Sequence, residues 1–155
     1  MASKSVNRFR ASLQAAGLAD TVVTLEQSAR TAREAADALG CEVGQIVKSL
    51  VFADSAREPL LVLAAGDVRV DEARVATLHG RTVSLGDAAF VRAVAGFAIG
   101  GVPPFGHPAP LATLVDASLL RWGIVWAAAG TPHSVFSLTT EELLRVTGGS
   151  TAEVG

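Results

Sequence analysis

The most constraining feature of this sequence is a pair of short apolar runs that follow one another closely. Residues 45–52 read QIVKSLVF and residues 59–66 read PLLVLAAG. Both runs are rich in branched apolar side chains, and the polar residues 53–58 between them are typical of a turn. The sequence therefore predicts two consecutive strands joined by a turn.

Further strands and helices are expected on both sides of this pair. Strand-like runs cover residues 21–25, 82–85, 111–115, 123–130 and 134–138. Helices are predicted over residues 6–16, 31–40, 71–78, 87–94 and 139–148. Several strands are consecutive, which argues against a doubly wound sheet. We expect one α/β domain over residues 1–155, with a mixed curved β-sheet or partial barrel flanked by helices.

Two of the expected helices begin with a capping box. In each, a threonine hydroxyl can accept from the backbone NH three residues later, and a glutamate at that position can reach back. The pairs are Thr31 with Glu34 and Thr139 with Glu142. These pairs indicate where the two helices start.

Composition and charge exclude several classes of protein. The 155 residues are 50% hydrophobic, which is enough to bury the core of one domain. The net charge of −2 provides no single-signed field for DNA or an anionic membrane. The first residues lack the apolar core of a signal peptide, and no apolar run reaches the ~18 residues of a membrane span. Since Cys41 is the single cysteine, we expect a cytoplasmic protein without a disulfide framework.

Lys48 is the most informative single residue. Side chains alternate along a strand, so Lys48 shares a face with three large apolar side chains. These are Ile46, Leu50 and Phe52. A buried ammonium without a partner destabilises a fold, so such a lysine either extends its tip to water or faces a polar cavity. The pattern leaves both interpretations open.

The segment GFAIGGVPPFGH, residues 96–107, places four glycines and two prolines within twelve residues. Gly100 and Gly101 can adopt backbone angles closed to other residues, while Pro103 and Pro104 stiffen the turn that follows. A loop of this kind can present rigid NH and C=O groups to a ligand. A purely structural turn is the alternative.

A second break, AAGTPHS, covers residues 128–134 between two expected strands. Gly130, Thr131 and Pro132 form a tight turn there, and His133 lies at its edge. By itself this pattern is typical of an ordinary β-turn.

Several kinds of catalytic site are disfavoured by the motifs. The glycine spacing resembles a phosphate-binding loop, but His107 and Pro108 replace the Lys and Ser/Thr that this loop needs. His79, His107 and His133 are not at metal-ligand spacing, so no metal site is expected. No G-x-S-x-G motif of a serine hydrolase occurs.

Three motifs taken together resemble the YbaK/ProX family of aminoacyl-tRNA deacylases. They are CEVGQIVKSLVF, GFAIGGVPPFGH and AAGTPHSVF, in this order and at these separations. The same fold occurs as the editing domain of bacterial prolyl-tRNA synthetases. The resemblance covers nearly the whole chain. It implies a trans-editing hydrolase that needs no cofactor and cleaves the ester between a wrong amino acid and the terminal adenosine of a tRNA.

The resemblance also implies roles for individual residues. Lys48 matches an essential lysine that binds and orients the substrate. The residues implied to bind the terminal adenosine and the aminoacyl group are Gly100, Gly101, Val102, Pro103, Pro104, His107, Gly130, Thr131, Pro132 and His133. The expected partner is the acceptor end of a mischarged tRNA, either that for proline or a related tRNA carrying a small amino acid. A synthetase is a second candidate partner.

Two departures from the family argue against cysteine as the amino acid removed. The members of the family that remove cysteine carry a tyrosine near the N-terminus, whereas this chain has no tyrosine. They also carry an acidic residue at the position that Val135 occupies in this chain.

The alternative function is a non-catalytic module of the same fold that binds a tRNA end or a synthetase. The weakly acidic net charge lends this alternative some support, because RNA affinity usually relies on a basic surface. Arg8, Arg10, Arg30 and Arg33 could form such a surface or lie on solvated helix faces.

Overall fold

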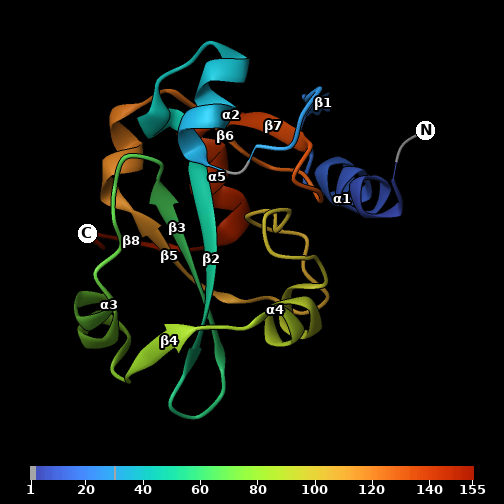
Figure 1. The fold of residues 1–155 in the computed structure, drawn as a ribbon. Helices are drawn as coiled ribbons and strands as arrows, with labels where there is room; N and C mark the ends of the chain where they lie inside the picture. The colour runs from blue at the N-terminus through green and yellow to red at the C-terminus, as the bar shows by residue number, and fades with distance from the viewer. Residues whose placement is uncertain (1–2, 30) are drawn as a thin grey trace.

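The computed structural model describes residues 3–29 and 31–155, which form two β-sheets surrounded by helices (Figure 1). The α-helices are α1 (Lys4–Ala15), α2 (Ala32–Leu39), α3 (Glu72–His79), α4 (Ala88–Ala95) and α5 (Thr140–Thr147). The 3-10 helices are η1 (Val43–Gln45) and η2 (Ala117–Arg121). The strands are β1 (Val23–Thr24), β2 (Val47–Asp54), β3 (Pro59–Ala65), β4 (Val83–Leu85), β5 (Ala112–Asp116), β6 (Ile124–Ala128), β7 (Ser134–Thr139) and β8 (Ser150–Ala152).

The two sheets differ in topology. The larger sheet has the strand order β4-β2-β3-β5-β8, in which β2 and β3 form an antiparallel hairpin and β3, β5 and β8 run parallel. The smaller sheet, β1-β7-β6, is antiparallel. This arrangement confirms the expected mixed α/β fold with consecutive strands. Over the described residues the two sheets stay open and do not close into a barrel. Of the two expected forms, a curved sheet and a partial barrel, the structure therefore agrees with the sheet.

Apolar side chains are buried on both faces of the β2–β3 hairpin. On one face, Val47 and Val51 join the main core, together with residues of α1, β6 and β7. On the other face, Phe52 packs in a second cluster with Val62 of β3 and Val75 of α3. Burial on two faces explains why the β3 sequence is an almost continuous apolar run rather than an alternating one.

The helix boundaries follow the expected capping residues. The Thr139 hydroxyl accepts from the NH of Glu142, and the Glu142 carboxylate accepts from the NH of Thr139, which completes that capping box. The Thr31 hydroxyl accepts from the NH of Glu34 at 3.1 Å. Among the described residues, no helix has the length and apolarity needed to cross a bilayer.

Strand β8 was not expected from the sequence. It contains three residues, Ser150–Ala152, of which two carry hydroxyl groups. So short and polar a segment has no strand signal of its own, and it is extended because it pairs in parallel with β5.

Asp54, at the end of β2, organises the turn of the hairpin. Its Oδ1 accepts from the NH groups of Ala56 (2.8 Å) and Glu58 (3.0 Å), and its Oδ2 accepts from Nε2 of His79 on α3 (2.9 Å). The hydrogen bond from His79 is the main reason that the pKa of Asp54 is lowered to about 2, and the backbone NH groups and Arg81 act in the same direction. The carboxylate thereby joins the hairpin to α3.

Replacing Asp54 by asparagine should destabilise the protein at neutral pH and have less effect in acid. The folded-state pKa of about 2 lies below the unfolded-state value of about 3.9. The stability that the carboxylate provides is therefore present above about pH 4 and is lost as the pH falls toward about 2. Urea unfolding of the wild type and D54N across this range measures the difference. A difference that stays constant with pH would contradict this role of Asp54.

Candidate functional site

A cavity of about 710 Å³ opens beside the first half of β2. Strand β4 pairs with β2 only through Phe52, Ala53 and Asp54, so in the described structure no strand continues along that edge over residues 48–50. The wall is completed by the start of α2, by strand β6 and by parts of two glycine-containing loops. These loops are the segments of residues 96–107 and 128–134. The cavity thus occupies the place that a neighbouring strand would otherwise fill.

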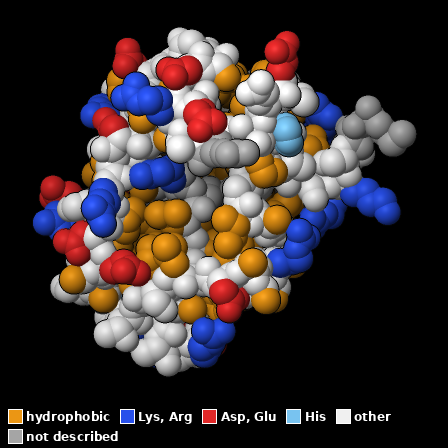
Figure 2. Space-filling model, viewed as in Figure 1, with side chains coloured by type: hydrophobic (Ala, Val, Ile, Leu, Met, Phe, Trp, Pro, Cys, Tyr) orange, Lys and Arg blue, Asp and Glu red, His pale blue; other side chains and the backbone are white. Residues whose placement is uncertain are grey.

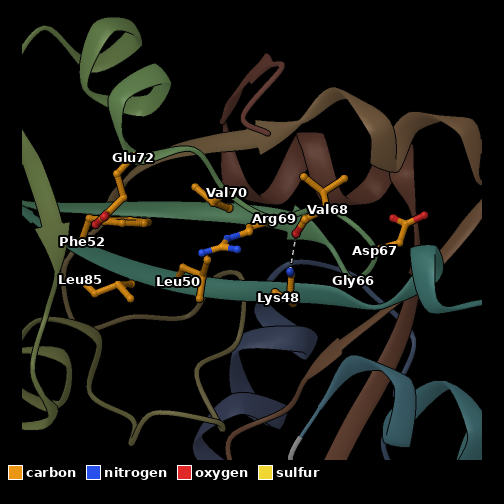
Figure 3. Close-up of a pocket in the computed structure, with 10 residues that line it drawn as sticks. All are labelled: Lys48, Leu50, Phe52, Gly66, Asp67, Val68, Arg69, Val70, Glu72 and Leu85. Atoms are coloured by element: carbon orange, nitrogen blue, oxygen red, sulfur yellow. Dashed lines mark hydrogen bonds between the residues drawn. The ribbon is translucent and has the colours of Figure 1, made fainter.

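Lys48 lies at the border between this cavity and a second hollow of about 460 Å³. Its side chain is partly buried, and its Nζ donates a hydrogen bond of 2.5 Å to the carbonyl of Val68 (Figure 3). Burial lowers the pKa of the Lys48 amine below its ordinary value, and the carboxylates of Asp116 and Asp67 oppose this shift. An ammonium has three N–H donors, so the contact with Val68 leaves donors for a ligand.

The second hollow follows the outer face of the hairpin. Leu50, Val70 and Leu85 lie along it, and the charged side chains of Arg69 and Glu72 lie among them (Figure 3). On the molecular surface, hydrophobic side chains gather at the hollowed centre of this face, with basic and acidic side chains around them (Figure 2). This surface can accept a ligand that combines apolar and charged parts.

The two glycine-containing loops touch through their backbones. The NH of Gly130 donates to the carbonyl of Gly101 at 3.0 Å. A Cβ on Gly101 would lie 2.7 Å from the Gly130 oxygen, and Gly130 has a φ of +115° that disfavours any side chain. The glycines therefore allow the two loops to approach and to form one continuous wall of the cavity.

The segment of residues 96–107 is anchored at two further points. His107 donates through Nε2 to the carbonyl of Pro103 at 2.8 Å, and burial lowers the pKa of His107 although this hydrogen bond opposes the shift. The ring of Phe105 lies in the core, 5.2 Å from the ring of Phe9 and 6.2 Å from that of Phe136. The loop is therefore fixed to the core and to itself.

The residues predicted to bind substrate divide into two groups. Those that line the cavity are Lys48, Gly100, Val102, Thr131 and Pro132. Those that lie outside its lining are Gly101, Pro103, Pro104, His107, Gly130 and His133. Gly101, Gly130, Pro103 and His107 make the contacts just described, and His133 accepts through its carbonyl from the NH of Leu25. Their binding roles stay predictions.

Three other residues of the cavity were not predicted from the sequence. Ser49 has a buried Oγ that makes no hydrogen bond within the described structure. Asp67 lines both hollows and forms an ion pair with Arg121 at 2.5 Å, and Trp126 lines the cavity from β6. Strand alternation could have identified Ser49 as a polar residue on an apolar face. No local sequence pattern identifies Asp67 or Trp126 as a residue of the cavity.

The arginines considered as a basic patch have separate surroundings. Arg8 donates to the carbonyl at the end of α4 at 2.6 Å, and Arg10 forms an ion pair with Asp20 at 2.9 Å. Arg33 lines the cavity, and Arg30 lies outside the described residues. Two of the four are thus engaged in contacts within the protein.

Residues 26–146 match the aminoacyl-tRNA editing domain family. The "Uncharacterized protein YwhH" of Bacillus subtilis is 33% identical over 122 residues, which cover 79% of this chain and 78% of that protein. The "Putative Cys-tRNA(Pro)/Cys-tRNA(Cys) deacylase EbsC" of Enterococcus faecalis is 26% identical over 125 residues, or 80% and 76% of the two chains. A solved structure titled "Crystal structure of a putative trans-editing enzyme for prolyl tRNA synthetase" superposes with a TM-score of 0.94 at 44% identity, covering 99% of this chain and 98% of the other.

Titration of the Lys48 amine should show a pKa below the ordinary lysine value of about 10.4. The chain has two lysines, Lys4 and Lys48, so methylation with ¹³C-formaldehyde and NMR titration can follow them separately, and K48R identifies the signal. Asp67→Asn should lower the pKa of Lys48 further, because it removes a carboxylate that favours the ammonium. A pKa at or above the ordinary value would show that the amine is not desolvated.

Gly101→Ala should destabilise the protein by about 1–3 kcal/mol, because the added Cβ overlaps backbone atoms that cannot rotate away. Gly123→Ala is the matched control, since a Cβ there meets no atom within 4 Å. Thermal unfolding of both variants measures the effect. Equal melting temperatures for the two variants would mean that the loops do not need their close contact.

Proposed function

The chain belongs to the aminoacyl-tRNA editing domain family, and from this premise we propose that it is a trans-editing aminoacyl-tRNA deacylase. It hydrolyses the ester of a mischarged tRNA, namely tRNA for proline or a related tRNA that carries a small amino acid. The 3′ end of the tRNA enters the cavity beside β2. A synthetase is a further candidate partner, from which the mischarged tRNA would be received.

The observation that carries this proposal is the position of Lys48. Its partly buried amine lies at the cavity border, on the strand edge that faces the wall made by the two glycine-containing loops. The ester and the ribose carry oxygen acceptors and little charge, so a single cation that is held in place can orient them. Lys48 is therefore proposed to bind and orient the aminoacyl-ribose.

Hydrolysis adds water to the ester carbonyl and expels the ribose oxygen. The attacking oxygen loses a proton, and the departing ribose oxygen gains one. A preorganised backbone NH directed at the developing oxyanion can lower the barrier by about 2.7–4 kcal/mol. The rigid wall that contains Gly100 and Val102 suits this role. A ribose hydroxyl or a side-chain group of the substrate can assist the proton transfer.

A non-catalytic binding module is the second candidate function. The net charge of −2 lends it some support, because RNA affinity usually relies on a basic surface, and Arg8 and Arg10 are engaged in contacts within the protein. Both candidate functions use the same cavity. They differ in whether Lys48 is needed for turnover or only for affinity.

Lys48→Ala should strongly reduce turnover while preserving the fold. The measurement is release of free amino acid from alanyl, cysteinyl and seryl esters of tRNA for proline. We expect the wild type to hydrolyse at least one of them and K48A to be slower by about 10²–10³-fold, which is the loss typical of removing one electrostatic donor. Lys4→Ala is the matched control, because Lys4 is the other lysine of the chain and is exposed on α1.

Circular dichroism must show that K48A retains its secondary structure. If the wild type releases amino acid from every tRNA only at the spontaneous rate and still binds tRNA, the binding module, and not the deacylase, is the function of the protein.

A further inference from the structure

The main chain of β2 turns its hydrogen-bonding groups alternately to two sides. In an antiparallel pair, the NH and C=O of every second residue point to the partner strand, and those of the residues between point to the opposite edge. The NH of Asp54 donates to the carbonyl of Glu58 at 2.9 Å, so the even-numbered residues of β2 face β3. On the other side, the carbonyl of Val51 accepts from the NH of Gly86 at 2.9 Å. The odd-numbered residues therefore turn their main-chain groups to the edge that β4 partly covers.

Ser49 is the odd-numbered residue at the uncovered part of this edge. Strand β4 pairs with β2 through residues 52–54, and at the other end Ile46 forms a bridge with Trp126 of β6. Between these two contacts, no strand of the described chain pairs with this edge. No backbone hydrogen bond from a described turn or loop reaches Ser49 either. Its NH and its carbonyl thus lie side by side on an open strand edge.

The cavity reaches the main chain at this point. Four consecutive residues of β2 line it, although their side chains alternate between the two faces of the strand. They are Val47, Lys48, Ser49 and Leu50. A hollow that touches consecutive residues in this way borders the edge of the strand. Ser49 is half-buried and its Oγ has less than 1 Å² of accessible surface, so the exposed surface of Ser49 belongs to its main chain and carbon atoms.

The length of the open edge selects its occupant. A peptide that added a strand here would have to continue past residue 52, where β4 is paired, and past Ile46, where β6 is in contact. The edge therefore has room for one residue. An aminoacyl group is such a residue, because its carbonyl accepts a hydrogen bond and its α-amine donates one.

We propose that the main chain of Ser49 binds the aminoacyl group as it would bind a residue of a neighbouring strand. The NH of Ser49 donates to the ester carbonyl, and the carbonyl of Ser49 accepts from the α-amine. This inference rests on the proposed deacylase function and assigns the main-chain contacts of its substrate. The reacting carbonyl is thereby held next to Lys48, the preceding residue of the strand, and its second lone pair stays available to the wall that contains Gly100 and Val102.

A pair of variants at one position separates the NH from the side chain. Ser49→Pro and Ser49→Ala both lack the hydroxyl, but only S49P lacks the NH. Proline is tolerated where the NH of a strand points away from the ladder. The kcat/KM for hydrolysis of the ester that the wild type cleaves fastest should be about 10²-fold lower in S49P than in S49A, the loss typical of one donor to a developing oxyanion. Equal values would show that the NH is not used.

Proline at the next position tests the assigned direction of the main chain. The NH of Leu50 faces β3, so Leu50→Pro removes a hydrogen bond of the ladder and should lower the melting temperature more than S49P does. An L50P variant that is more stable than S49P would overturn the assignment. If S49P does not fold, hydrogen exchange in the wild type decides the question.

Hydrogen exchange followed by NMR observes the NH of Ser49 directly. In the free protein this NH should exchange rapidly, whereas the NH of Leu50 should be protected by the ladder. The probes are the alanyl, cysteinyl and seryl amides of 3′-amino-3′-deoxyadenosine, in which an amide replaces the ester. Saturation with at least one of them should slow the exchange of Ser49 by about tenfold or more. Slow exchange without a probe, or no change with any of them, would overturn the inference.

The contact with the α-amine has its own test. The propionyl amide of the same nucleoside lacks only the amine of the alanyl amide, so it should bind about tenfold or more weakly in calorimetry. Equal affinities of the two amides would show that the amine is not paired.

These measurements distinguish failure of this inference from failure of the proposed function. Exchange and affinity are measured without hydrolysis, so protection of Ser49 by an amide supports the pairing even if no ester is cleaved. If esters are cleaved and the exchange of Ser49 does not respond to any amide, the inference is wrong while the deacylase function stands.

Discussion

The burial of the β2–β3 hairpin on both faces is the constraint on which the rest of the structure depends. Cross-strand pairs run from Val47 with Ala65 to Ala53 with Pro59, and each face contacts its own apolar cluster. Because both faces are covered, β2 cannot shift its register without moving polar side chains into one cluster and apolar ones out of the other. The position of Lys48 beside the cavity is fixed as a result.

The cavity exists because β2 is incompletely paired along one edge, and the glycine-containing loops give it a rigid wall. The hydrogen bond between Gly130 and Gly101 joins two segments that are separated by strands β5 and β6. Phe105 and His107 hold the first of these segments in place. A wall that is ordered before a ligand arrives loses less entropy on binding, which favours the orientation of a small ligand.

The electrostatics of the site balance desolvation against nearby carboxylates. Burial disfavours the charged form of Lys48, whereas Asp67 and Asp116 favour it. Asp116 is itself fixed, since its Oδ2 accepts from the NH of Ala65 at 2.9 Å and its Oδ1 from the NH of Ser118 at 3.0 Å. The cation at the cavity border is thus supported by a carboxylate that belongs to the sheet.

The sequence by itself determined the local structure. Alternation placed Lys48 on its face of β2, capping residues such as Thr139 located the helix starts, and the three motifs identified the family. These features depend on neighbours within a few residues. Only the tertiary structure decided which residues line the cavity: it brought Gly101 against Gly130, left Ser49 without a partner and extended β8. Each of these outcomes depends on contacts between segments far apart in the chain, and the periodicity of a single segment carries no information about its distant neighbours.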